Sequence, residues 1–143
     1  MFYRVKNVSA MSGWKLFVEF ANGTTKTYDM VPFIDAHPAL EPLKDWSLFE
    51  QAAVDVGGYG VVWNDDYDVS ANELWENGVA VKTPFDGLMS FADASSLWGL
   101  SESTLRKAVV YGKIVPGLDA RKYGKQWIVS RESMVREYGE PAA

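Results

Sequence analysis

Cysteine is absent from the 143-residue chain, and histidine occurs only once, as His37. Without cysteine the chain has no disulfide and no thiolate nucleophile, so a cytoplasmic protein is the simplest expectation. His37 precedes Pro38 in a proline-rich loop, which favours a surface residue over a catalytic base. One histidine is also too few for a zinc site. We therefore expect no enzyme activity, no bound metal and no cofactor.

Long apolar runs are missing too, and none approaches the roughly 20 residues that span a bilayer. No apolar stretch follows the first charged residues, so we expect neither a signal peptide nor a membrane partner. A calcium loop starting at Asp66 would need glycine and glutamate where Ala71 and Asn77 stand. The glycines of residues 57–60 lack the lysine and hydroxyl residue of a phosphate loop.

Charge is distributed unevenly along a chain whose net charge is −5. Residues 1–86 hold thirteen acidic and six basic residues, whereas residues 87–143 hold six acidic and eight basic residues. Such an asymmetry indicates two modules with different partners. We predict an acidic α+β domain over residues 1–80, a linker over 81–87 that contains Pro84, and a second domain over 88–143.

The N-terminal pattern is typical of a small antiparallel sheet. Apolar and polar residues alternate over 3–8, and aromatic and β-branched residues follow over 14–20 and 24–30. Asn22-Gly23 predicts a type I′ turn between the last two strands. Pro32 and Pro38 are expected to interrupt regular structure. Further predicted elements are short helical pieces over 39–43 and 46–51, a hairpin around Gly57-Gly58, and a helix over 71–76 capped by Ser70.

This half also carries a family resemblance. Trp-Ser-Leu-Phe-Glu at 46–50, Val-Val-Trp-Asn at 61–64 and the run Tyr-Asp-Val-Ser-Ala-Asn-Glu-Leu-Trp-Glu-Asn-Gly at 67–78 resemble a small bacterial domain-of-unknown-function family, number 2442. The resemblance covers about residues 1–80 and implies no set of catalytic residues. Relatives are commonly encoded beside small toxin-like proteins or fused to a helix-turn-helix, which implies an antitoxin or regulator context.

Residues 90–112 predict a helix-turn-helix. Ser90 with Asp93 resembles a capping box, and Gly99 ends the first helix. Ser101 caps a second helix that ends at Gly112. Its inner face is predicted to hold Leu105, Ala108 and Val109, and its outer face Glu102, Ser103, Arg106, Lys107 and Val110. Two short helices joined by a glycine-containing turn suit DNA binding, because arginine, lysine and serine contact bases and phosphates.

A hairpin turning at Tyr123-Gly124 is predicted next, with a return strand over 126–129 and a last helix over 131–138. With the preceding motif, these residues resemble excisionase-type or winged helix-turn-helix domains. The resemblance implies that the hairpin is a wing whose basic tip meets phosphates, and that Trp127 and Ile128 point inward. We expect Trp127 to pack against Leu105 and Val109. The six residues 115–120 lengthen the segment before the wing relative to that family.

The sequence thus predicts an α+β protein with an antiparallel-sheet N-terminal domain and a C-terminal helix-turn-helix domain with a β-hairpin wing. The predicted function is a DNA-binding transcriptional regulator, antitoxin-like or of a phage or mobile element, with double-stranded DNA as partner. The N-terminal domain would bind a basic protein or a ligand, and specific control would need a homodimer. The alternative is an antitoxin-type adaptor that caps a partner protein without binding DNA. The predicted DNA-binding residues are Ser101, Ser103, Arg106, Lys107, Lys113, Arg121, Lys122 and Lys125.

Overall fold

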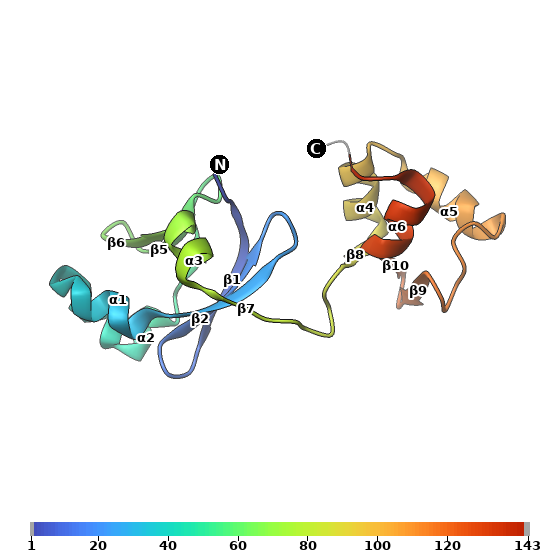
Figure 1. Ribbon diagram of the computed structural model, residues 1–143. Helices are drawn as coiled ribbons and strands as arrows, with labels where there is room; N and C mark the ends of the chain where they lie inside the picture. Colours follow the sequence, from blue (N-terminus) through green and yellow to red (C-terminus); the bar gives the residue numbers. More distant parts are fainter. Residues whose placement is uncertain (1, 142–143) are drawn as a thin grey trace. The chain divides into compact units, whose positions relative to one another are not determined.

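The computed structural model describes residues 2–141, which form two compact units that divide after Asp86 (Figure 1). Each unit has its own cluster of buried apolar side chains. Both units combine helices with antiparallel strands, so the predicted α+β class is confirmed.

The larger sheet of the first unit contains four strands. They are β1 (Val5–Met11), β2 (Lys15–Phe20), β3 (Thr25–Asp29) and β7 (Val79–Ala80), in the order β1-β2-β3-β7, and all neighbours are antiparallel. The three-stranded meander follows the predicted alternation, because Leu16, Val18 and Phe20 point into the core from β2. The edge strand β7 was not predicted.

A smaller sheet and four short helices complete the first unit. The sheet contains β4 (Ala53–Val54), β5 (Gly60–Trp63) and β6 (Tyr67–Ser70). The helices are α1 (Met30–Ala36), the 3-10 helix η1 (Pro38–Lys44), α2 (Trp46–Phe49) and α3 (Ala71–Asn77). Trp63 is fully buried at the centre, and its indole Nε1 donates to the carbonyl of Phe49 at 2.8 Å. This hydrogen bond lets a large aromatic ring enter the core without an unsatisfied donor.

Helix α1 corrects the expectation that Pro32 interrupts regular structure. Asp29 caps the helix, and its carboxylate accepts the N–H of Val31 at 3.0 Å. Pro32 is the third helical residue, where the missing N–H would have had no partner within the helix. Proline is therefore tolerated at this position, and the third strand ends at Asp29 instead of residue 30.

The β2–β3 hairpin forms as predicted, but its turn is not type I′. A type I′ turn needs positive φ at both central residues, and only Gly23, at φ 89°, has it. The loop contains one more residue than expected, since the N–H of Phe20 donates to the carbonyl of Thr24 at 2.8 Å and that of Gly23 to Phe20 at 2.9 Å. This is a type I turn followed by a left-handed glycine.

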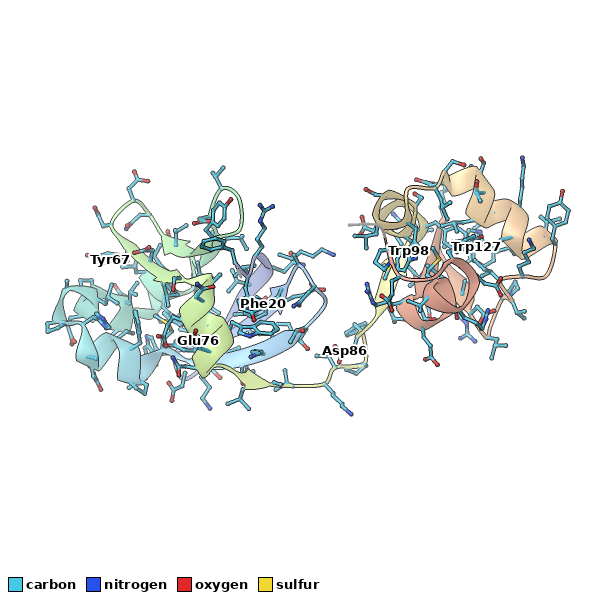
Figure 2. All side chains as sticks on the ribbon, turned by 45° about the horizontal axis from the view of Figure 1, so that its top comes forward. Phe20, Tyr67, Glu76, Asp86, Trp98 and Trp127 are labelled. Carbon is cyan, nitrogen blue, oxygen red and sulfur yellow. The ribbon has the colours of Figure 1, made fainter. Side chains whose placement is uncertain are left out.

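The second unit packs three helices with a three-stranded sheet. Its elements are β8 (Leu88–Ser90), α4 (Phe91–Trp98), α5 (Glu102–Val110), β9 (Ala120–Tyr123), β10 (Gln126–Ser130) and α6 (Arg131–Tyr138), and the strand order is β8-β10-β9. Trp98 and Trp127, both labelled in Figure 2, contribute to its core. The indole Nε1 of Trp98 donates to the carbonyl of Gly139 at 2.7 Å and thereby ties α4 to the end of α6.

The stretch 81–86 is bonded to the first unit. Thr25 is almost fully buried and exchanges two hydrogen bonds with Val81, one through its hydroxyl at 2.7 Å and one through its carbonyl at 3.0 Å. Asp86, labelled in Figure 2, folds the end of this stretch by accepting the N–H of Thr83 at 2.9 Å. The hydrogen bonds that Thr83 donates to Asp86 hold the pKa of the Asp86 carboxyl below its ordinary value, and the bond from the Thr83 backbone is the largest cause.

Candidate nucleic-acid interface

Helices α4 and α5 form the predicted helix-turn-helix. The Ser90 hydroxyl caps α4 by accepting the N–H of Asp93 at 3.1 Å, and Gly99 ends it in the left-handed conformation at φ 65° and ψ 31°. The Ser101 hydroxyl then caps α5 by accepting the N–H of Thr104 at 3.2 Å. Glycine takes the left-handed conformation without a steric penalty, so the turn between the helices is short.

Helix α5 presents one buried and one exposed face, as its spacing predicts. Leu105 and Ala108 are buried and Val109 is half-buried. The exposed face holds Glu102, Ser103, Arg106, Lys107 and Val110. Arg106 forms an exposed ion pair with Glu102, one turn earlier, with Nη1 3.4 Å from Oε2. The outer face of α5 therefore carries two cations and one carboxylate.

The hairpin β9–β10 supplies the predicted wing, but its turn is at Gly124-Lys125 and not at Tyr123-Gly124, because Tyr123 still pairs with Gln126 as a strand residue. Arg121, Lys122 and Lys125 are all exposed, but the pairing separates them. Lys122 lies opposite Trp127, and Arg121 lies opposite Ile128. Because cross-strand partners share a face and neighbours alternate, Lys122 and Arg121 project from opposite faces of the sheet. Trp127 and Ile128 likewise cannot both point inward, which corrects the expectation drawn from the wing resemblance.

Trp127 is the inward residue of that pair, and it packs against the buried cluster of this unit, to which Leu105 belongs. Its ring stacks on Phe91 of α4, with the ring centroids 5.6 Å apart and the planes 10° from parallel. Val129, two residues further along β10, is fully buried on the same face of the strand. The wing is thereby fixed to the first helix of the helix-turn-helix.

Two predicted site residues, Ser101 and Lys113, form hydrogen bonds within the protein. Ser101 does so through its hydroxyl and Lys113 through its backbone. The Ser101 hydroxyl caps α5 and lies 2.9 Å from the hydroxyl of Ser103. The N–H of Lys113 donates to the carbonyl of Ala108 at 2.9 Å, and its own carbonyl accepts from Arg136 at 3.4 Å. The Lys113 ammonium extends from an anchored backbone just after the end of α5.

A buried carboxylate between α5 and the wing was missed by the sequence analysis. The Asp119 side chain is only 2% exposed and accepts hydrogen bonds from Arg136, Ser133 and the N–H of Val115. Its pKa lies well below the ordinary value, first because Arg136 donates to it. The same contact raises the pKa of Arg136. No periodicity marks Asp119, since it lies in a turn rather than on a helix face.

Five of the predicted site cations are electrostatically uncompensated. Within residues 2–141, the side chains without an ion-pair partner in the described part of the chain include Lys107, Lys113, Arg121, Lys122 and Lys125. They occupy α5, the segment after it and the wing. Unpaired cations on exposed elements attract phosphate, and no ion pair within the protein has to be broken for the contact to form.

The first unit offers an open cleft instead of a basic surface. It measures about 500 Å³, and Lys15, Tyr28, Phe33, Glu73 and Asn77 are among its lining residues. The Tyr28 hydroxyl and the Asn77 amide each donate to Oε2 of Glu73 at 2.7 Å. Burial, and then the neighbouring Glu73, raise the pKa of the Tyr28 hydroxyl above its ordinary value.

Over residues 2–141, His, Cys, Asp and Glu side chains form no group of three or more that could hold a metal ion. In the same range the helices are all too short or too polar to cross a bilayer.

Comparison with known proteins identifies both halves of the chain. The family described as "Protein of unknown function (DUF2442)" matches residues 5–80, which is more than half of the chain. The chain belongs to this family. A second family, described as "Helix-turn-helix domain", matches residues 81–143. The two resemblances drawn from the sequence are thus confirmed, and the units are named below the DUF2442 domain and the helix-turn-helix domain.

Among solved structures, the DUF2442 chain is similar to the crystal structure of a protein from Nitrosomonas europaea, NE0471, whose name describes it provisionally as DNA-binding. The two sequences are 18% identical, the similarity covers 82% of this chain and 81% of that chain, and the TM-score is 0.43. No curated protein sequence matches the chain.

Proposed function

We propose that the protein is a DNA-binding transcriptional regulator whose helix-turn-helix domain contacts the major groove. The observation that carries the proposal is the set of five uncompensated cations on α5, on the segment after it and on the wing of that domain. The helix-turn-helix family match supports it, since this motif places its second helix in the major groove. Ser103 and Arg106 would contact base edges, and the lysines and Arg121 phosphates.

The DUF2442 domain would then control the regulator. Its excess of acidic residues disfavours contact with DNA, and its cleft could receive a ligand or its surface a basic protein. A single helix-turn-helix contacts few base pairs, so operator recognition would use two copies of the chain. An antitoxin-like or mobile-element regulator is the proposed biological setting.

The second candidate is a protein-interaction adaptor that binds no DNA. The observation that favours it is the charge of the DUF2442 domain, with thirteen acidic and six basic residues over 1–86. Such a surface suits a basic partner protein, and the helix-turn-helix would then serve only in assembly. The two candidates differ in what the intact chain does with duplex DNA.

Selection of binding sites from random duplex DNA, followed by fluorescence titrations at several salt concentrations, tests the proposal. Three to five phosphate contacts predict that affinity falls between about fortyfold and about 500-fold from 50 to 200 mM salt. An enriched sequence with this salt dependence supports the regulator. If the intact chain binds no duplex even at low salt, the regulator is ruled out and the adaptor takes its place.

A further inference from the structure

Glu102 is the one acidic residue of α5, so its charge opposes contact with DNA. It lies at the N-terminal end of this helix, which is the end that would read bases. It is the first residue of α5, next to the cap Ser101, and its side chain is 48% exposed. In a helix-turn-helix the N-terminal residues of the second helix contact base edges. A carboxylate at this position repels phosphates unless it finds a hydrogen-bond donor.

Glu102 is held beside Arg106 in the free protein. The two charges lie one turn apart on the same side of α5, with Arg106 Nη1 3.4 Å from Glu102 Oε2. The pair is exposed on both sides, so its own contribution to stability is small. The backbone positions of the two residues are nevertheless about 6 Å apart along the helix axis, so that on DNA the carboxylate and the guanidinium can reach different base pairs.

The major groove offers few donors for such a carboxylate. Its amino donors are cytosine N4 and adenine N6, and glutamate accepts typically from cytosine, whereas arginine donates to guanine O6 and N7. We infer that Glu102 is a specificity-determining residue, which accepts a hydrogen bond from a cytosine N4 amino group within about two base steps of the guanine contacted by Arg106. This inference rests on the proposed DNA-binding function.

The carboxylate would also act against incorrect sequences. On a duplex with thymine or guanine in place of that cytosine, Glu102 faces thymine O4 or guanine O6, both of which are acceptors. Placing acceptor against acceptor weakens binding to the incorrect site, and specificity is the difference between the affinities for the two sites. Glu102 therefore lowers affinity for random DNA and raises the ratio of specific to random binding.

Glu102 also has a structural role in stabilising α5, and this role must be distinguished from base recognition. A carboxylate in the first turn stabilises any helix through the positive N-terminal end of its dipole. Glu132 also lies in the first turn of its helix, as the second residue of α6, and it is also exposed. Glu132→Gln is therefore a matched control that removes the same charge from the same kind of helix position, away from α5.

The experiment selects sites in parallel with wild type, Glu102→Gln and Glu132→Gln, and then titrates each protein on the wild-type site and on that site with the cytosine changed to thymine. Wild type and Glu132→Gln should lose about tenfold or more on the change, because a carboxylate meets thymine O4. Glu102→Gln should lose less than about threefold, because the amide can donate to O4. It should also bind random duplex severalfold more tightly than wild type.

The outcomes are distinguishable. If the wild type binds duplex but all three proteins discriminate cytosine from thymine equally, or Glu102→Gln changes only the melting temperature, Glu102 reads no base and the inference is wrong while the proposed function stands. If the wild type binds no duplex at low salt, the proposed function fails and the inference fails with it.

Discussion

Arg136 donates hydrogen bonds to Asp119 from both terminal nitrogens, with Nη1 2.8 Å from Oδ1 and Nη2 3.0 Å from Oδ2. The carboxylate also accepts from the Ser133 hydroxyl and from the N–H of Val115, each at 2.8 Å. Arg136 and Ser133 belong to α6, whereas Val115 and Asp119 belong to the segment between α5 and the wing. This cluster therefore fixes that segment to α6.

The first prediction concerns the pH dependence of the helix-turn-helix domain. The folded-state pKa of Asp119 lies below its ordinary value of 3.8, because Arg136 and two further donors stabilise the carboxylate. A lowered folded-state pKa contributes stability that is complete above pH 3.8 and is lost as the pH falls through the folded-state value. We expect the free energy of unfolding to fall by roughly 1–3 kcal/mol between pH 4 and pH 2, measured by urea titration of amide signals from residues 87–141.

The variant Asp119→Asn tests whether Asp119 causes this pH dependence of the free energy of unfolding. The variant should be less stable than wild type at pH 7, and the difference should shrink as the pH falls from 4 toward 2, because the Asp119 carboxyl of the unfolded chain becomes protonated in this range. Asp93→Asn is the matched control, because Asp93 is an exposed carboxylate of the same domain. A constant difference between wild type and Asp119→Asn across this range would show that Asp119 does not cause the pH dependence.

Sequence reasoning found the elements of the helix-turn-helix because their signals are local. Caps such as Ser90 and Ser101 and the left-handed Gly99 act within four residues, and the sequence displays them directly. Asp119 could not be found in this way, since its burial depends on Arg136, seventeen residues later. A lone carboxylate in a turn normally indicates a solvated residue.

Other errors have the same origin. Proline breaks a helix when it lies in the helix interior but is tolerated in the first turn. Pro32 stands in the first turn of α1, so it does not interrupt the helix. The strand β8 is three residues long, and only its pairing with β10 makes it a strand. The stacking of Trp127 on Phe91 depends on how β10 crosses α4, which no spacing in the sequence encodes.

The second prediction concerns that stack. Trp127 is half-buried and covers Phe91, so Trp127→Ala removes the stack and opens the core of the helix-turn-helix domain. We expect a cost of about 3 kcal/mol, which is a large share of the stability of so small a domain. Thermal unfolding followed by circular dichroism measures it. Trp127→Phe keeps a stacked ring and should lose less than half as much, whereas an unchanged melting temperature for Trp127→Ala would exclude Trp127 from the core.

The third prediction is that each unit folds without the other. The core clusters of the two units share no residue, so fragments 1–86 and 87–143 should each give dispersed amide spectra and unfold cooperatively. Fragment 1–80 serves as a comparison, because it lacks the Val81 groups that bond Thr25. It should be less stable than 1–86 by about 1–2 kcal/mol. Random-coil spectra from both 1–86 and 87–143 would show that the units depend on each other.

The fourth prediction separates base contacts from phosphate contacts. Arg106 lies on the exposed face of α5, where it would reach base edges, and Lys122 and Lys125 lie on the wing, where they would meet only phosphate. Arg106→Ala should lose about 1–3 kcal/mol on the selected site and relax discrimination at one position. Lys122→Ala and Lys125→Ala should weaken binding to selected and scrambled duplexes alike, each lowering the salt-dependence slope by about one.

Titrations of these variants at several salt concentrations decide the assignment, and Lys82→Ala is the control. Lys82 is an exposed lysine of the stretch that bonds to the DUF2442 domain, so its removal changes the net charge equally but should leave the slope unchanged. If Arg106→Ala instead lowers affinity for both duplexes by the same factor, Arg106 contacts phosphate, and α5 does not read bases through it.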